Sequence, residues 1–277
     1  MQAKEVLPLK RSEYLARRRR ARVAAMMLFA LIMGFVSAAP PVVTGCQAQD
    51  LTPVPDTSVL SPAISVPVQA EPAAPVLPEK WVCLTFDDGP DVYTGELLDT
   101  LERYGAQATF FMLGSNVEKY GADTIPRMAA LGCELGNHSY SHPNMKKLSV
   151  DDGLAQFQMT DDLIAQYNNG QGATVVRFPY GNSTDDLLAE IGRPSIMWDV
   201  DTLDWETKNV QANISAVLDS VSPGDIILMH DIHEATVESC ATIVPELVNR
   251  GYELVTIHTL AAANGVDLAA GETYYGF

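Results

Sequence analysis

From Lys80 onward, short apolar runs alternate with longer amphipathic segments. The runs are Trp81–Phe86, Ala108–Leu113, Cys133–Asn137, Thr174–Phe178, Ser195–Val200, Asp225–His230 and Glu253–Ile257. Each run has the length of a buried strand, and strands that are joined by helices must run parallel to one another. The alternation therefore predicts an α/β fold, an open or closed barrel of about seven parallel strands.

The segments between the runs carry the spacing of amphipathic helices. Leu97, Leu98 and Leu101, for example, fall on one face of a helix. The spacing predicts helices over Gly95–Tyr104, Val150–Tyr167, Val210–Val221 and Val237–Arg250.

The N-terminal residues have the composition of an export signal or a membrane anchor. Five arginines between Arg17 and Arg22 precede Val23–Ala39, a run of 17 residues without a charge. Basic residues stay on the cytoplasmic side, so the rest of the chain is expected outside the cell. The run is long for a cleaved signal and slightly short for a spanning helix, and Val43–Cys46 resembles a bacterial lipobox. A spanning anchor, a lipoprotein and a freely secreted protein therefore all stay open.

Proline content separates this N-terminal part from the rest of the chain. Nine of the 17 prolines fall between Pro40 and Pro78, and such a stretch favours an extended, semi-rigid spacer. We expect four parts: the basic stretch and signal or anchor (1–45), a Pro/Ala-rich linker (46–79), a catalytic domain (80–264) and a C-terminal tail (265–277).

The charge of the chain bears on its partners, and its cysteines bear on metal binding and disulfides. Residues 46–277 hold 10 basic and 33 acidic side chains, a balance that repels nucleic acid and predicts no such partner. We expect a monomer. The cysteines show no spacing of metal ligands, and Cys83, Cys133 and Cys240 are read as buried small hydrophobic residues. A disulfide between Cys83 and Cys133 stays open.

Polar residues recur where the expected strands end. These segments are Thr85–Pro90, His138–His142, Arg177–Gly181, Asp201–Trp205 and His230–Asp231. Catalytic groups of (β/α) barrels gather at the carboxyl ends of the strands, so we expect these segments to meet in one site.

A pair of histidines suggests a metal site. If residues 138–142 form a helical turn, His138 and His142 share one face of it. Together with a carboxylate from Asp87 or Asp88, they would form a three-residue ligand set that leaves coordination positions open. Two histidines at this spacing often occur by chance, and a Gly-Pro turn such as the one after Asp88 is common as well. Neither feature alone therefore identifies a metal site.

The five segments in this order resemble the polysaccharide deacetylases of carbohydrate esterase family 4, also known as the NodB-homology domain. The resemblance covers Lys80 to about Leu260 and implies a distorted (β/α) barrel. It also implies that Asp87 is the general base and that Asp88, His138 and His142 bind a divalent metal. Zinc is the expected ion, with Co²⁺ and Ni²⁺ as alternatives.

The resemblance implies roles for the remaining motif residues as well. Arg177 would hold and tune Asp87, and the backbone N–H of Tyr180 would bind the oxyanion. Asp204 would orient His230, the general acid. The residues expected at the substrate are Trp205, Leu228 and Pro179. His233, His258, Asp199 and Asp201 are read as packing, surface or structural residues.

The predicted function is removal of N-acetyl groups from cell-wall glycan by a membrane-tethered extracellular hydrolase. The expected substrate is the N-acetylglucosamine (GlcNAc) of peptidoglycan, because a tethered and spaced domain meets wall glycan first. The alternatives are a chitin-oligosaccharide deacetylase, an acetylxylan esterase and, more remotely, an inactive glycan-binding wall protein. A metalloprotease is disfavoured, since no H-E-x-x-H sequence is present.

Overall fold

The structure, a computed structural model, describes residues 80–277. In this part of the chain nine strands form one sheet, and every pairing in it is parallel. The strands are β1 (Lys80–Asp87), β2 (Thr109–Met112), β3 (Glu134–Asn137), β4 (Val175–Val176), β5 (Ser195–Ile196), β6 (Val200–Asp201), β7 (Ile226–His230), β8 (Tyr252–Leu254) and β9 (Thr273–Tyr274). They follow the order β6-β7-β1-β2-β3-β4-β5-β9, and β8 pairs with the first residues of β1. The parallel (β/α) fold is confirmed, as a barrel that is open between β6 and β9 in this strand order.

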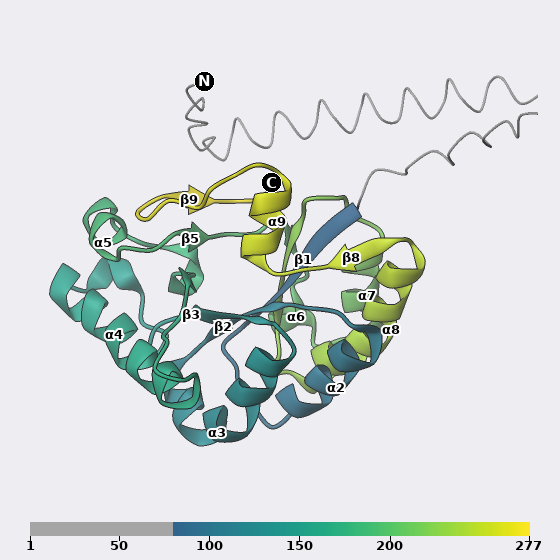
Figure 1. Ribbon diagram of the computed structural model, residues 1–277, viewed down its shortest axis with the longest axis horizontal. Helices are drawn as coiled ribbons and strands as arrows, with labels where there is room; N and C mark the ends of the chain where they lie inside the picture. The colour runs from purple at the N-terminus through teal and green to yellow at the C-terminus, as the bar shows by residue number, and fades with distance from the viewer. Residues whose placement is uncertain (1–79) are drawn as a thin grey trace, which may run out of the picture. The chain divides into compact units, whose positions relative to one another are not determined.

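Helices connect the strands and pack along the outside of the curved sheet (Figure 1). The α-helices are α2 (Thr94–Tyr104), α3 (Gly114–Ala130), α4 (Val150–Tyr167), α5 (Asp185–Glu190), α6 (Asp204–Thr207), α7 (Val210–Leu218), α8 (Glu234–Asn249) and α9 (Ile257–Ala263). Two 3₁₀ turns, Met145–Lys147 and Pro179–Gly181, complete the elements of the described residues. The four predicted helices are present, and α4 has the predicted bounds because Ser149 caps it by accepting a hydrogen bond from the Asp152 N–H.

Two features of the sheet differ from the sequence prediction of about seven strands. The single run Ser195–Val200 forms two short strands, β5 and β6, with Trp198 in the break between them. The tail also adds a strand, because β9 pairs with β5 and lies beside it in Figure 1. The sheet therefore includes residues beyond 264, in the segment expected to be a tail.

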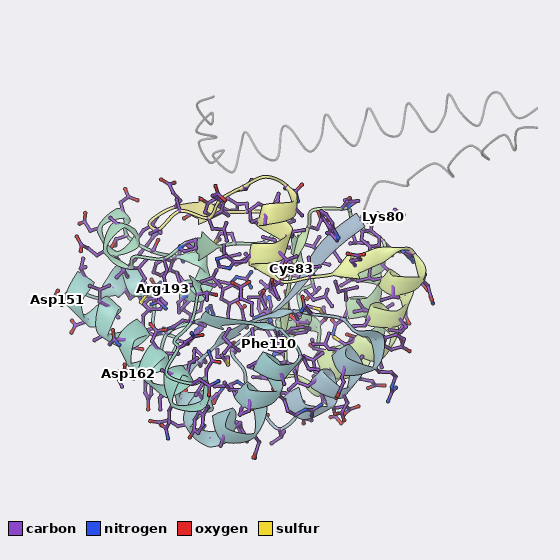
Figure 2. All side chains as sticks on the ribbon, viewed as in Figure 1. Lys80, Cys83, Phe110, Asp151, Asp162 and Arg193 are labelled. Atoms are coloured by element: carbon purple, nitrogen blue, oxygen red, sulfur yellow. The ribbon has the colours of Figure 1, made fainter. Side chains whose placement is uncertain are left out.

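The apolar core includes the three cysteines of the described residues. Cys83, Cys133 and Cys240 are buried as free thiols, which confirms the packing interpretation and leaves the Cys83–Cys133 disulfide unformed. Figure 2 shows Cys83 and Phe110 inside the fold, whereas Asp162 projects from the outer side of α4. Burial raises the pKa of Cys83 to about 12 and that of Cys133 to about 11, so these thiols stay protonated and inert.

The first and last residues of the described domain meet at one edge of the sheet, the edge where the parallel strands begin. The Gly224 N–H donates to the Trp81 carbonyl over 2.8 Å, and the Phe277 N–H donates to the Gly224 carbonyl over 3.3 Å. A β-carbon on Gly224 would lie 2.2 Å from the Phe277 carbonyl oxygen, so only glycine permits this contact. We call this edge the amino edge and the opposite one the carboxyl edge.

The expected membrane segment and linker lie outside the described residues, as does Cys46. Between residues 80 and 277, none of the helices is both long and apolar enough to cross a membrane.

Candidate active site

The expected motif residues gather at the carboxyl edge of the sheet. Asp87 ends β1 and is in register with His230, which ends β7. A pocket of about 390 Å³ opens beside them. The residues that line it are Asp87, Asp88, His138, His142, Phe178, Tyr180, Gly181, Trp198, Asp201, Trp205, Leu228 and His230.

Asp88, His138 and His142 converge on one point in this pocket. One ligand atom from each lies within 4.8 Å of the others. Asp88 Oδ1 is 3.6 Å from His138 Nε2 and 3.7 Å from His142 Nε2. Within the described residues, this oxygen is one of three buried side-chain atoms without a hydrogen-bond partner. An unpaired buried carboxylate oxygen that faces two imidazoles fits a divalent metal.

His138 is prepared for a ligand role by its surroundings. Its Nδ1 lies 2.6 Å from the Arg177 carbonyl, which can only accept, so Nδ1 carries the proton and Nε2 keeps its lone pair. Burial lowers the pKa of His138 to about 3, so the ring is neutral at physiological pH. A neutral imidazole with its free nitrogen directed at a carboxylate is the form that binds a metal.

The helical turn that would align the two histidines is not formed. Residues 138–142 form a loop in which Ser139 and His142 have positive φ angles of 77° and 57°. The loop is held by its own side chains, because Asn137 Oδ1 accepts from the Ser139 N–H and Ser139 Oγ accepts from the His142 N–H. The histidines therefore meet through loop geometry and not through the i,i+4 spacing of a helix.

Arg177 contacts Asp87 in the interior. Its Nη1 lies 2.6 Å from Asp87 Oδ1 and 2.8 Å from the Thr85 hydroxyl, and both charged side chains are buried. The guanidinium carbon also lies 4.1 Å from the centre of the Phe111 ring. Burial raises the pKa of Asp87, against the opposing charge of Arg177, so the carboxylate is more basic than an exposed one.

His230 and Asp204 form a second charged pair across the pocket. Asp204 Oδ1 lies 2.8 Å from His230 Nδ1, while Oδ2 accepts from the His230 N–H over 2.7 Å and from the Thr236 hydroxyl. Burial lowers the pKa of His230, but the hydrogen bond and charge of Asp204 outweigh it and raise this pKa to about 9. For Asp204, burial alone would raise the pKa of the carboxyl group. The hydrogen bond to His230 and the charge of its ring outweigh burial, so the pKa of Asp204 is lowered. The imidazole is therefore cationic at neutral pH.

Of the residues expected at the substrate, two line the pocket. Trp205 is 49% exposed at its mouth, and Leu228 is buried at its base. Pro179 is buried in the 3₁₀ turn and is absent from the lining of this pocket. Its neighbour Tyr180 has a φ of 59° and packs edge-on against the His142 ring, 4.5 Å between centroids.

Comparison with known proteins shows which family has this sequence and fold. The family model described as polysaccharide deacetylase matches residues 75–193. The solved structure of an acetyl xylan esterase of this type from Clostridium thermocellum, in complex with a cobalt ion, has a TM-score of 0.67 and 33% sequence identity. That match covers 71% of this chain and 98% of the esterase. The chain belongs to the polysaccharide deacetylase family.

Two curated members of the family are more similar in sequence. The peptidoglycan-N-acetylmuramic acid deacetylase PdaC of Bacillus subtilis is 40% identical over 183 residues, which are 66% of this chain and 39% of PdaC. The peptidoglycan-N-acetylglucosamine deacetylase PgdA of Listeria monocytogenes is 39% identical over 197 residues, 71% of this chain and 41% of PgdA. The solved PdaC structure matches with a TM-score of 0.66. This family member thus spans about two fifths of the length of those two relatives.

Several site residues of this polysaccharide deacetylase were not anticipated as such. Trp198 lines the pocket from the break between β5 and β6, and Gly181 lies close to it, since a β-carbon there would be 3.3 Å from the Trp198 ring. The sequence offered a signal, because a tryptophan next to Asp199 is unusual in a fully buried strand. Asp201 also lines the pocket, while its Oδ1 accepts from the Leu203 N–H, which agrees with the structural interpretation.

The other residues that the sequence set aside lie at packing, surface or structural positions. Asp199 lies in the break between β5 and β6, and its Oδ2 accepts from the N–H of Ile226, the first residue of β7. His258 bonds to Glu134, which lies at the start of β3. His233 is half-buried beside His230, with 6.1 Å between the ring centroids.

Proposed function

We propose that this chain is a metal-dependent peptidoglycan N-acetylglucosamine deacetylase that acts outside the cytoplasm as a monomer. The observation that carries the proposal is that one pocket holds two charge pairs with opposite roles. A buried carboxylate is held by Arg177 on one side, and a cationic imidazole is held by Asp204 on the other. A base and an acid separated in this way are what hydrolysis of an amide requires.

Each side chain has a role that follows from its position. Asp87 accepts the proton of the attacking water, since its carboxylate is basic and lies beside the ligand set. His230 donates a proton to the leaving nitrogen, and Asp204 keeps it charged for that step. Leu228 and Trp205 enclose the acetyl methyl group. The Tyr180 N–H donates to the oxyanion that develops on the acetyl carbonyl.

The ligand set proposed for the metal is Asp88, His138 and His142. Zinc suits two imidazoles and one carboxylate. A metal bound there would supply Lewis-acid polarisation of the acetyl carbonyl. The relatives named for peptidoglycan, PdaC and PgdA, support a wall glycan as the substrate, and the relative named as an acetyl xylan esterase supports the principal alternative.

Acetate release from defined glycans tests this function. The purified chain with added zinc should release acetate from peptidoglycan and leave free amines on its GlcNAc residues, detected by mass spectrometry of muropeptides. The matched control is His142→Ala, which removes one ligand from a partly exposed loop position and should lose both zinc and acetate release. Acetate from acetylated xylan with none from peptidoglycan would replace the proposal with the esterase. Amines on N-acetylmuramic acid instead of GlcNAc would refute the choice of sugar.

We further propose that the chain is tethered to the membrane with residues 46–277 outside the cytoplasm. The arginines before the uncharged run Val23–Ala39 support this orientation. Fractionation should retain the full chain with membranes, and an externally added protease should digest it in intact protoplasts. Labelled palmitate that is lost in Cys46→Ser would identify a lipoprotein, whereas retention without a label would identify a spanning anchor. A mature chain that begins near Pro40 and is free in the medium would refute both.

A further inference from the structure

Asp231 is a buried carboxyl group that the proposed reaction does not use. It follows His230 at the end of β7, and its side chain has no exposed surface. Its Oδ2 accepts a hydrogen bond of 2.5 Å from the Thr94 hydroxyl, while Oδ1 has no hydrogen-bond partner. Burial raises the pKa of Asp231 to about 7. A buried carboxyl oxygen without a hydrogen-bond partner lowers the stability of the fold, so we expect this group to have a role of its own.

The carboxyl group lies directly against the backbone of Gly89, the residue that follows the proposed metal ligand Asp88. A β-carbon on Gly89 would be 2.2 Å from Asp231 Oδ1 and 2.4 Å from Oδ2. These separations are far shorter than any van der Waals contact, so the carboxyl group occupies the space that a side chain at position 89 would need. Asp231 thereby packs against the loop, and it is not among the residues that line the pocket.

Thr94 extends this support to the other end of the loop. Its hydroxyl donates to Asp231 and also accepts from the Asp91 N–H over 2.8 Å. Thr94 is the first residue of α2 and is fully buried. Asp231 therefore contacts the loop at Gly89 and, through Thr94, at Asp91, so one side chain spans the connection from β1 to α2.

The loop has an unusual backbone conformation at Asp88. Its φ is 72°, in the left-handed region, which residues with a side chain adopt only uncommonly. On the β2 side, the Asp88 N–H donates to the Phe111 carbonyl and the Asn116 side chain donates to the Asp88 carbonyl over 2.8 Å. On the β7 side, the support comes from Asp231.

We propose that Asp231 is a positioning residue that directs the Asp88 carboxylate toward the two histidines, and so sets the metal affinity of the site. The inference rests on the metal site of the proposed function. Asp231 connects the strand that carries His230 to the loop that carries Asp88. The proposed acid and the proposed metal ligand are therefore held by one side chain. Groups that orient a metal ligand without touching the metal typically contribute 10–100-fold to affinity.

The experiment measures zinc affinity by competition with a chromogenic chelator, on the full chain in detergent and without substrate. Asp231→Ala should raise the zinc Kd by at least about 10-fold. Asp231→Asn keeps an acceptor for Thr94 and a planar group against Gly89, so its Kd should stay within about 3-fold of the parent value.

The matched control is Glu134→Gln. Glu134 is also a buried carboxylate, bonded to Thr174 and His258, but it lies at the amino edge. Its replacement should lower Tm and leave the zinc Kd unchanged. This contrast separates positioning of the ligand from a general loss of stability, which would weaken zinc binding in both variants.

A zinc Kd of Asp231→Ala within twofold of the parent value would overturn the inference, and so would an equal weakening in Glu134→Gln. If Asp231→Ala does not fold, Thr94→Val removes the hydroxyl link with little change in volume. It should raise the Kd by about 3-fold or more, and an unchanged Kd would overturn the inference. If the parent chain itself binds no zinc, the proposed metal site is refuted, a result distinct from failure of the variants.

Discussion

Asp87→Asn is expected to lower kcat on peptidoglycan by about 10²–10⁴-fold, the usual contribution of a general base. The amide cannot accept a proton from water, yet it has nearly the shape of the carboxylate and still accepts from Arg177. The zinc content should stay at the parent value, because the ligand set is formed by Asp88, His138 and His142. Elemental analysis and turnover on the same preparation test both parts.

The two adjacent carboxylates provide their own control. Asp88→Asn should lose zinc as well as activity, since Asp88 Oδ1 is the unpaired oxygen that faces both imidazoles. If Asp87→Asn loses its zinc and Asp88→Asn keeps it, the roles are reversed. The comparison is a stringent test because both carboxylates lie equally close to His138. Asp87 Oδ2 and Asp88 Oδ1 are each 3.6 Å from His138 Nε2.

His230→Asn is expected to lower turnover of N-acetylated glycan by about 10²–10⁴-fold and of an activated aryl acetate by less than about 10-fold. An amine must be protonated before it leaves, whereas a phenolate leaves without help. The parent enzyme should lose activity as the pH rises through about 9, where His230 gives up its proton, and the variant should lack this alkaline limb.

His233→Asn is the matched control for this prediction. It replaces a neighbouring imidazole, 6.1 Å from His230 between ring centroids, that has no proposed part in the reaction. Its pH–rate profile should follow that of the parent. Equal losses on amide and aryl ester in His230→Asn would contradict the assignment of a general acid.

The sequence predicted most of the strands and four of the helices because their signals are local. Ser149 and the apolar spacing after it define α4, and the uninterrupted run before His230 defines β7. The helix α3 (Gly114–Ala130) was missed, since Gly121 and Pro126 in its interior weaken the helix propensity, whereas burial of its inner face stabilises it in the fold. The strand β9 was missed because two residues carry no periodicity, and its pairing partner β5 is distant in sequence.

The site could be predicted in its residue types but not in its loop conformations. The carboxylates and histidines stand in recognisable segments at strand ends. The left-handed backbone at Asp88, Ser139 and His142 could not be foreseen, because it depends on hydrogen bonds from β2 and from within the loops. The same holds for Trp198, whose place in the pocket follows from a break within one apolar run.

The contact between Phe277 and Gly224 has a practical consequence for presenting the enzyme to solid substrates. Because β1 begins at Lys80 beside this contact, both ends of the described domain leave it at the amino edge, across the sheet from the pocket. An affinity tag added after Phe277 would therefore attach on the side away from the pocket. Protein captured through that tag on a sensor chip would keep its pocket accessible to fragments of insoluble cell wall.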